Sequence, residues 1–403
     1  MFDSSRRWLF LAAAFAVLVI TARPSAAATS GPWRVDPTPN PGGAQVATIY
    51  FLGVSASGPT DAWSVGIDDV NSFRRPLVEH WDGLRWRAVR VPQPPGRQAW
   101  FHGVLQLGPT DVWAVGESSN ADSQTEGERT LIEHYDGSAW TIVPTPNPAR
   151  GTRSANILTS ISGTGPGDIW AAGYDFDPSA DTIEFLLEHW DGTSWTASPS
   201  PTPPGGLDSA WAVTAIAPDD AWAVGDSALQ VTRAAHWDGS VWTMVPTPFL
   251  HDGSNPTNLL TGVTATSSDD VWASGYEGNA FGRNLSRPYM VHWNGSNWTL
   301  TTLPNRGGEG SLLRGTVALS SSDVWAVGQT QELDGSILTL TERFDGGAWS
   351  IVPSPSPGHI GRIRVNGLEG VAWAGGTSLF AMGFQEFEGA CCTRTLGLST
   401  DGA

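Results

Sequence analysis

The chain has 403 residues, more than one packed core usually holds, so its length predicts several domains or a repeat array. Its 22 basic residues are all arginine and 40 residues are acidic, which gives a formal net charge of −18. An acidic surface repels phosphate backbones and anionic lipids, so we expect no nucleic-acid partner.

The N-terminus predicts a signal peptide over residues 1–28. Arg6 and Arg7 precede an apolar run, Trp8–Ile20, and an Ala-x-Ala cleavage pattern follows at Ala26–Ala28. The run is shorter than the ~20 residues that span a bilayer. We expect cleavage near Ala28, export by the general secretory or twin-arginine route to the extracellular space or cell envelope, and no membrane span in the mature chain.

One repeated unit organises the rest of the chain. It is clearest as DVWAVG at Asp111–Gly116, a turn at His134–Gly137 and a closing Trp140. The first aromatic residue of the unit recurs every 50 to 57 residues, at Trp63, Trp113, Trp170, Trp222, Trp272, Trp325 and Phe380. This period, with short aromatic strands and Gly/Asp turns, predicts an all-β, seven-bladed propeller of four-stranded antiparallel blades.

Each repeat reads as four strands. In the fifth copy we expect a first strand at Leu260–Thr266, a second at Val271–Gly275, a third that ends at His292 and a fourth that begins at Trp298. Length varies mainly between the second and third strands. In antiparallel blades these variable connections share one face with the Pro-rich links between blades. This loop-rich face is the candidate working surface.

The two ends of the chain complement each other. The segment around Trp33 matches the fourth strand of a repeat, whereas Leu396–Ala403 supplies a third strand with an Asp401-Gly402 turn and then stops. We therefore predict one domain over residues 29–403. The N-terminal strand would complete the last blade and close the ring, which removes the open sheet edges. We expect a monomer.

The turns carry a family resemblance. With its DVWAVG…HWDGxxW repeats and Asp-box-like hairpins such as Asp82–Trp86, the chain resembles secreted bacterial propellers of the kelch and galactose-oxidase central-domain type. The resemblance implies a propeller over residues 29–403. Asp82 is followed directly by Gly83, whereas the sialidase Asp-box has a further residue between them, so the resemblance does not imply sialidase catalysis. Val65-Gly66 also replaces the double glycine of kelch repeats.

Residues that recur in every blade are interpreted as structural. Of the 21 Trp residues, 17 occupy repeat positions, where we expect them to pack blade against blade. The repeated histidines and the acids before the second strand should fix turns. The histidines are His80, His134, His189, His236 and His292, and the acids are Asp61, Asp111, Asp168, Asp220, Asp270 and Asp323.

The best candidate site is a position that aligns in all seven repeats but differs in residue type. It lies eleven residues before the second-strand aromatic, and we expect it at the start of the innermost strand, around the mouth of the central channel on the loop-rich face. His102 offers a base, Trp211 a stacking surface, Arg314 a carboxylate-binding fork and Glu369 a carboxylate. The seven predicted binding residues are Leu52, His102, Thr159, Trp211, Thr261, Arg314 and Glu369.

Neither a metal nor a cofactor is predicted. Asp175, Asp177 and Asp181 lack the glycine of a calcium loop. Cys391 and Cys392 are adjacent, so they are either two thiols or a strained vicinal disulfide. A copper-radical oxidase needs a Tyr-Cys cross-link, which this pair does not suit, and no catalytic residue is assigned.

The favoured function is non-catalytic recognition of a protein, peptide or glycan on the loop-rich face. One alternative is a secreted enzyme, a lyase, glycosidase or oxidase, that uses the channel mouth. The other is a structural module of a cell-surface assembly.

Overall fold

The computed structural model describes residues 32–41, 47–120, 127–228, 231–248, 257–278, 286–304, 310–387 and 393–400. These residues form 30 β-strands. In this part of the chain we find no helix of the length and apolarity needed to cross a membrane. The predicted signal peptide, the Asp401-Gly402 turn and the Cys391-Cys392 pair lie outside the described residues.

Seven four-stranded antiparallel sheets form the blades of a propeller, which confirms the predicted fold class. Blade 1 is β2(Ala47–Gly58), β3(Asp61–Val70), β4(Phe73–Trp81) and β5(Trp86–Ala88), and blade 2 is β6(Arg97–Gly108), β7(Asp111–Asn120), β8(Arg129–Tyr135) and β9(Trp140–Val143). Blade 3 is β10(Ala155–Gly165), β11(Asp168–Asp177), β12(Thr182–Trp190) and β13(Trp195–Ala197), and blade 4 is β14(Asp208–Ala217), β15(Asp220–Ser227), β16(Val231–Trp237) and β17(Trp242–Val245). Blade 5 is β18(Thr257–Ser267), β19(Asp270–Gly278), β20(Arg287–Trp293) and β21(Trp298–Thr301), and blade 6 is β22(Gly310–Ser320), β23(Asp323–Gln331), β24(Ile337–Phe344) and β25(Trp349–Ile351). Blade 7 is β28(Asn366–Trp373), β29(Leu379–Gln385), β30(Arg394–Thr400) and β1(Trp33–Asp36), and a small hairpin, β26(His359–Ile360) and β27(Ile363–Arg364), precedes it.

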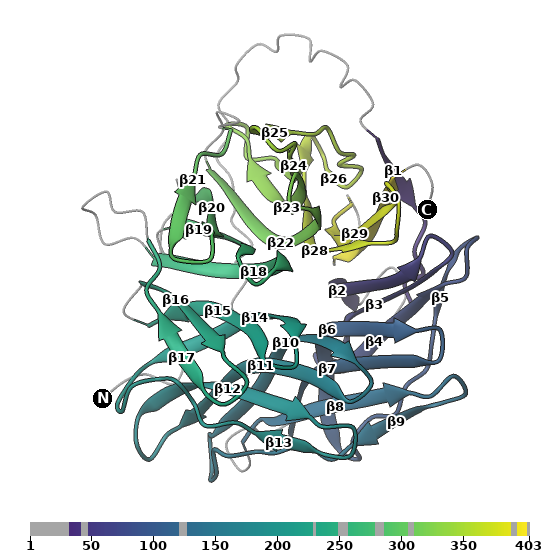
Figure 1. Ribbon diagram of the computed structural model, residues 1–403. Helices are drawn as coiled ribbons and strands as arrows, with labels where there is room; N and C mark the ends of the chain where they lie inside the picture. The colour runs from purple at the N-terminus through teal and green to yellow at the C-terminus, as the bar shows by residue number, and fades with distance from the viewer. Residues whose placement is uncertain are drawn as a thin grey trace.

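The first strand of each blade lies innermost. Each of these strands contacts the first strand of the next blade, and β28 contacts β2, so together they surround the axis of the ring (Figure 1). The approach is close: a Cβ on Gly53 would lie 2.8 Å from the carbonyl oxygen of His102 in the next blade. Because only glycine lacks a Cβ, it suits this contact.

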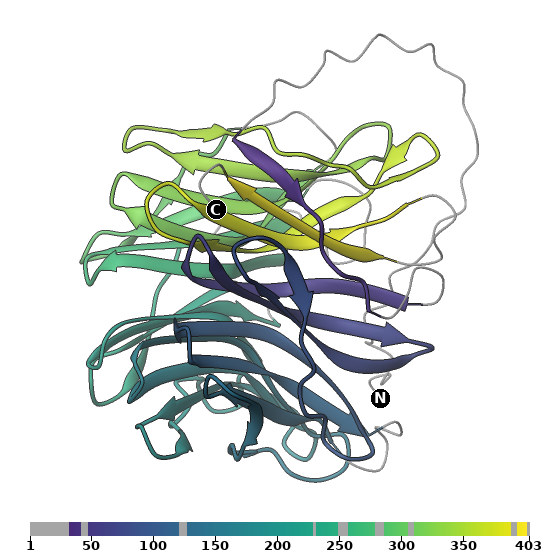
Figure 2. The ribbon, with the colours of Figure 1, turned by 90° about the vertical axis from the view of Figure 1, so that its right-hand side faces the viewer.

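The ring is closed by the two ends of the described chain. β1 pairs antiparallel with β30, with Trp33 opposite Thr400 and Asp36 opposite Gly397. In Figure 2 the purple β1 runs beside the yellow C-terminal strands. Trp33 is 5% exposed and packs edge-on against Trp325 of blade 6 at 5.7 Å between ring centroids. The predicted completion of the last blade is thus confirmed.

The hydrophobic cores lie between neighbouring blades. Each core joins second-strand and fourth-strand aromatics, as where Trp170 of blade 3 packs edge-on against Trp242 of blade 4 at 5.0 Å. The six second-strand tryptophans and the seven fourth-strand tryptophans are all at most 7% exposed. This confirms their predicted packing role, since a buried indole removes a large apolar area from water.

The third-to-fourth-strand hairpins are built as the sequence predicts. In blade 2 the Asp136 carboxylate accepts hydrogen bonds from the backbone amides of Ser138 and Ala139. Gly137 then adopts a φ of +91°, which glycine reaches without strain. Hydrogen bonds from the Ser138 hydroxyl and these amides lower the pKa of Asp136 to about 2.

The second strands are longer than the sequence predicts. We expected the fifth copy's second strand to end at Gly275, but β19 continues to Gly278, and β3 likewise continues past Gly66 to Val70. In blade 1, only Asn71 and Ser72 separate β3 from β4. Part of the length that the sequence shows as a variable loop is therefore paired strand.

Candidate functional site

All seven predicted site residues occupy the same backbone feature, a β-bulge in the first strand of each blade. In blade 2 the register with β7 shifts between Phe101 and Gly103, so His102 is the extra residue. The same shift surrounds Leu52, Thr159, Trp211, Thr261, Arg314 and Glu369. We call these seven residues the axial ring.

The innermost strands begin earlier in the chain than we expected, so the axial ring lies inside these strands and not at their starts. The sequence placed these residues at the start of the innermost strand, whereas each lies inside it, three to five residues beyond its first residue. A bulge leaves one residue unpaired and re-aims its side chain. The residue before each bulge is fully buried between blades, and the bulge residue is partly exposed. The bulge therefore turns one side chain per blade out of the core.

A second set of residues lies on the second strands, and its members in blades 2 to 5 contact the axial ring. The set is the residue that directly follows the second-strand glycine: Ile67, Glu117, Tyr174, Asp226, Tyr276, Gln329 and Phe384. The glycine before it is required sterically, because a Cβ on Gly116 would lie 2.1 Å from the Trp100 carbonyl oxygen. We call this set the post-glycine ring. Sequence reasoning missed this set, although each member directly follows a glycine that is present in all seven repeats.

In blade 2 the two rings meet through His102. Its Nε2 lies 3.2 Å from Glu117 Oε1, and the Trp100 indole N–H also points to Nε2 at 3.1 Å. Glu117 is 5% exposed, and its Oε2 has no hydrogen-bond partner among the described residues. An unpartnered buried carboxylate oxygen is costly unless something pairs with it.

In blade 4, Trp211 links the rings. Its indole N–H donates to Asp226 Oδ1 at 2.6 Å, and its ring packs edge-on against Tyr174 of blade 3 at 5.8 Å. Burial raises the pKa of Asp226 to about 6, although the Trp211 hydrogen bond opposes the rise. A tryptophan, a tyrosine and a carboxyl thus converge from two neighbouring blades.

In blades 5 to 7, Arg314 is the centre of a third cluster. Its Nε lies 3.4 Å from Glu369 Oε2, and its guanidinium carbon lies 5.5 Å from the Tyr276 ring centroid. The side chains of Arg314 and Glu369 are 33% and 17% exposed, so water reaches both. Burial raises the pKa of Glu369, and the Arg314 charge offsets only part of that rise.

The remaining predicted residues are less available to a ligand. The Thr159 hydroxyl donates to the carbonyls of Ala172 and Ala210, and the Thr261 hydroxyl donates to those of Ser274 and Leu313. Each therefore ties its own blade to the next. Leu52 contributes an apolar side chain without hydrogen-bonding capacity.

The repeated histidines are paired with acids of their own blades. The Nε2 atom of each histidine lies 2.7 to 2.9 Å from a carboxylate oxygen of the acid that begins the second strand. Its ring lies over the second-strand tryptophan, as His134 does over Trp113 at 4.1 Å. In blade 6, Arg343 takes this place and binds Asp323 through two nitrogens. These contacts agree with the predicted structural role.

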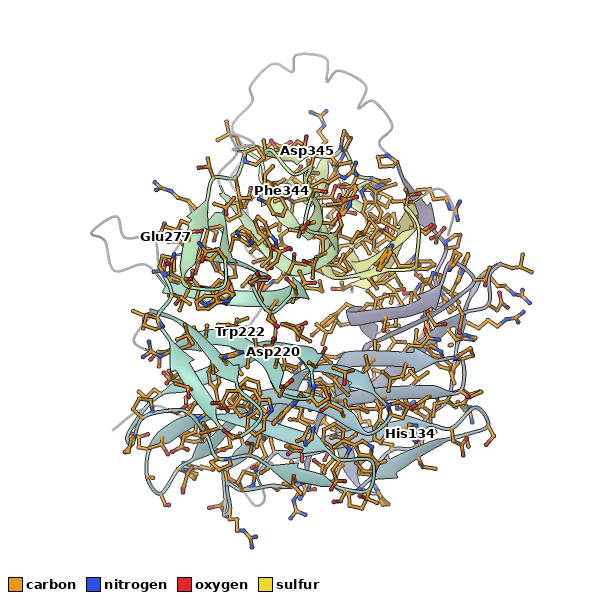
Figure 3. All side chains as sticks on the ribbon, viewed as in Figure 1. His134, Asp220, Trp222, Glu277, Phe344 and Asp345 are labelled. Atoms are coloured by element: carbon orange, nitrogen blue, oxygen red, sulfur yellow. The ribbon has the colours of Figure 1, made fainter. Side chains whose placement is uncertain are left out.

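A cavity of about 380 Å³ lies between blades 4 and 5, on the face opposite the loop-rich face. Its lining includes Asp220, Trp222, His236 and Trp293, and Figure 3 labels Asp220 and Trp222 there. Asp220 and His236 are already paired at 2.9 Å and repeat around the ring. The cavity is therefore a gap in the blade packing rather than a distinct constellation.

Within the described ranges, no three His, Cys, Asp or Glu side chains are grouped so that they could hold a metal ion. Asp175 and Asp177 face different surroundings: burial raises the pKa of Asp175 to about 7, whereas hydrogen bonds from Ser179 lower that of Asp177. The residues of the two rings suit hydrogen bonding and stacking.

Comparison with known proteins establishes the fold class, a β-propeller, and no narrower family. No protein-family model and no curated protein matches the sequence. A structure of YCF48 bound to a D1 peptide superposes with a TM-score of 0.53, at 14% identity over 93% of this chain and 98% of that chain. A protein of unknown function from Dyadobacter fermentans gives 0.52, at 10% identity over 91% and 97%.

A polysaccharide lyase, an ulvan lyase bound to a GlcA(1-4)Rha3S saccharide, superposes with a TM-score of 0.51, at 10% identity over 87% of this chain and 96% of that chain. At such identities these likenesses concern the fold alone. The similarity to kelch and galactose-oxidase-type propellers stays an interpretation of the sequence.

Proposed function

We propose that this protein is a non-catalytic recognition module that binds a protein, peptide or glycan at the axial and post-glycine rings, on the loop-rich face. One observation carries the proposal. The same register shift occurs in the first strand of all seven blades, yet the residue type at the bulge changes from blade to blade, except that Thr159 and Thr261 are both threonine. A constant frame that presents different, partly exposed side chains suits selective binding.

The surroundings support this use. Trp211, Tyr174 and Tyr276 supply flat apolar surface, and Arg314, Glu369 and Asp226 supply directional polar groups. Ligand sites commonly combine an apolar lining with a few placed polar groups. Two of the superposed propellers were solved with a peptide and with a saccharide, so the frame accommodates either kind of ligand in those proteins.

The test is a peptide-array and glycan-array screen of the mature chain, repeated with Trp211→Ala. We expect at least one ligand whose binding falls about tenfold or more in Trp211→Ala, since loss of a buried aromatic contact costs more than 1 kcal/mol. The matched control is Trp373→Ala, because Trp373 is 43% exposed and ends β28 on the opposite face. Ligands that are equally sensitive to both variants, or to neither, would contradict the site.

One cluster favours a second candidate function, an enzyme. Glu369 has a raised pKa beside Arg314 and the Tyr276 ring, an arrangement that can donate a proton and stabilise an anion. The enzyme hypothesis expects turnover of a polysaccharide or other substrate that Glu369→Gln abolishes without change in melting temperature. Binding without turnover supports the recognition module.

Export belongs to the same proposal. We propose that cleavage near Ala28 releases the mature chain, as a monomer, outside the cell or into its envelope, which Arg6, Arg7 and the Ala26–Ala28 pattern support. Mass spectrometry of the exported protein should give an N-terminus close to Thr29. An N-terminus at Met1 on a cell-retained protein would contradict this.

A further inference from the structure

The positions where blades 2, 3 and 4 meet the axis differ from the rest of the ring in charge. Tyr174 of blade 3 lies between Glu117 of blade 2 and Asp226 of blade 4. Burial raises the pKa of the Tyr174 hydroxyl, and the nearby carboxylates of Glu117, Glu128 and Asp226 all raise it further. The local potential at this phenol is therefore negative.

Two arginines on these blades, Arg97 and Arg233, are already engaged. The Arg97 guanidinium donates to the Ser118 and Gly127 carbonyls and to Asn120 Oδ1. Arg233 is paired with Asp208 at 3.0 Å. On the other side of the axis, the guanidinium of Arg314 lies beside the Glu369 carboxylate. The two sides of the axis thus differ within the two rings: on one side Arg314 pairs with Glu369, whereas on the other side the ring residues of blades 2 to 4 include Glu117 and Asp226 and no arginine.

A second, independent feature points to a missing partner. Glu117 Oε2 is buried and has no hydrogen-bond partner among the described residues, while Oε1 contacts His102, an axial-ring residue. His102 Nε2 lies 3.1 Å from the Trp100 indole nitrogen and 3.2 Å from Glu117 Oε1. To accept from the Trp100 N–H this nitrogen must carry no proton, whereas to donate to Glu117 it must carry one, so it cannot do both at once. A cation beside Glu117 would pair with the carboxylate and leave His102 free to accept from Trp100.

Aromatic side chains complete the surroundings. Tyr174 and Trp211 meet edge to face, and Trp211 holds Asp226 through its indole N–H. A cation near aromatic faces and carboxylates gains from both cation–π attraction and charge-assisted hydrogen bonds. Planar guanidinium suits this combination better than ammonium, because it stacks and donates in a fork.

We propose that Glu117, Tyr174, Trp211 and Asp226 form a subsite for a cationic side chain, arginine in particular, of a peptide or protein ligand. The inference rests on the proposed recognition function and narrows its ligand class. Neutral and acidic glycans lack the fixed positive charge that this subsite would pair with, so the subsite favours a peptide.

The test uses two capped pentapeptides, Gly-Gly-Arg-Gly-Gly and Gly-Gly-Gln-Gly-Gly, titrated against the mature chain by calorimetry or ligand-observed NMR. We expect the arginine peptide to bind at least about tenfold more tightly than the glutamine peptide. Glu117→Gln and Asp226→Asn should each reduce that preference about tenfold. Asp219→Asn is the control, because it removes one charge from an exposed turn on the opposite face and should leave the preference unchanged.

Each result decides the proposal. If Glu117→Gln alone lowers the melting temperature, Asp226→Asn still tests the subsite. Equal binding of the two peptides, or a preference that all three variants reduce equally, overturns the cationic subsite. A neutral glycan that depends on Trp211 but not on Glu117 also overturns it and leaves the recognition function standing, whereas no binding of any peptide or glycan removes both.

Discussion

The Trp–His–Asp contacts within blades 1 to 5 and the axial ring of all seven blades both follow the repeat, but they use it in opposite ways. Within the blade, the set that His134, Trp113 and Asp111 form in blade 2 keeps its residue types and closely similar distances in blades 1 to 5. At the axis the backbone bulge is constant and the side chain changes, from His102 to Trp211 to Arg314. The comparison separates positions that hold the ring together from positions that are free to meet a ligand.

The largest effect should come from breaking ring closure. Trp33→Ala removes the indole that packs against Trp325 and is expected to lower the free energy of unfolding by about 3 to 5 kcal/mol, as for other buried Trp-to-Ala changes. Denaturant unfolding measures it. Val35→Ala, on the same strand but 40% exposed, is the control, and an equal loss in both variants would contradict the closure role.

A smaller but still large effect is expected at the second-strand glycine. In Gly116→Ala the new Cβ would lie 2.1 Å from the Trp100 carbonyl oxygen, so the two strands must separate, at a cost of about 3 kcal/mol. Gly108→Ala has no atom within 4 Å of its new Cβ and serves as the control. Thermal melting should show a lower melting temperature for Gly116→Ala and an unchanged one for Gly108→Ala. An unchanged melting temperature in Gly116→Ala would mean that β6 and β7 are not this close.

Four buried glutamates predict a pH dependence. Burial raises the pKa of Glu79 to about 9 and those of Glu133, Glu188 and Glu342 to about 8. The folded chain keeps these protons where the unfolded chain, with pKa near 4.5, has lost them. This contribution to stability is therefore greatest at acid pH and decreases as pH rises from about 4.5 toward 9.

Glu79→Gln isolates that contribution, because both Glu79 carboxylate oxygens lack hydrogen-bond partners in the described structure and glutamine does not ionise. We compare the melting temperature of the variant with that of the parent protein at each pH. The variant's advantage should be larger at pH 8 than at pH 5. A difference that does not change between the two pH values would mean that Glu79 stays ionised in the fold.

The smallest effect is expected in the hairpin turns. Asp136→Asn should leave the melting temperature nearly unchanged, because Asn294 accepts the same two backbone hydrogen bonds in blade 5. Asp136→Ala removes the acceptor and should lower the melting temperature measurably. If both variants melt alike, the side-chain acceptor contributes nothing to the turn.

The repeat made the fold predictable from sequence. Seven copies of the same turn and tryptophan spacing fix the strand order, and the matching ends at Trp33 and Leu396 predict closure, which the β1–β30 pairing confirms. Alignment of the repeats was enough to find the axial-ring positions, but it did not show that each of them is a β-bulge. A bulge is an extra residue in the pairing register, which no single strand reveals.

The post-glycine ring was missed for a related reason. We ended the second strand at its glycine, so Glu117 and Tyr174 fell into a supposed variable loop, although β7 continues to Asn120 and β11 to Asp177. The buried glutamates were missed because an acidic residue in a strand usually faces water. Glu188 instead lies between blades, where the Thr145 hydroxyl donates to it.

The most direct test of this account measures binding and stability together in one channel-side variant and one blade-packing variant. Trp211→Ala should lose ligand binding about tenfold or more and keep the parent melting temperature, whereas Trp170→Ala should lower the melting temperature sharply. If Trp211→Ala instead melts as early as Trp170→Ala, or binds as the parent does, then the ring around the axis is part of the frame and not the recognition surface.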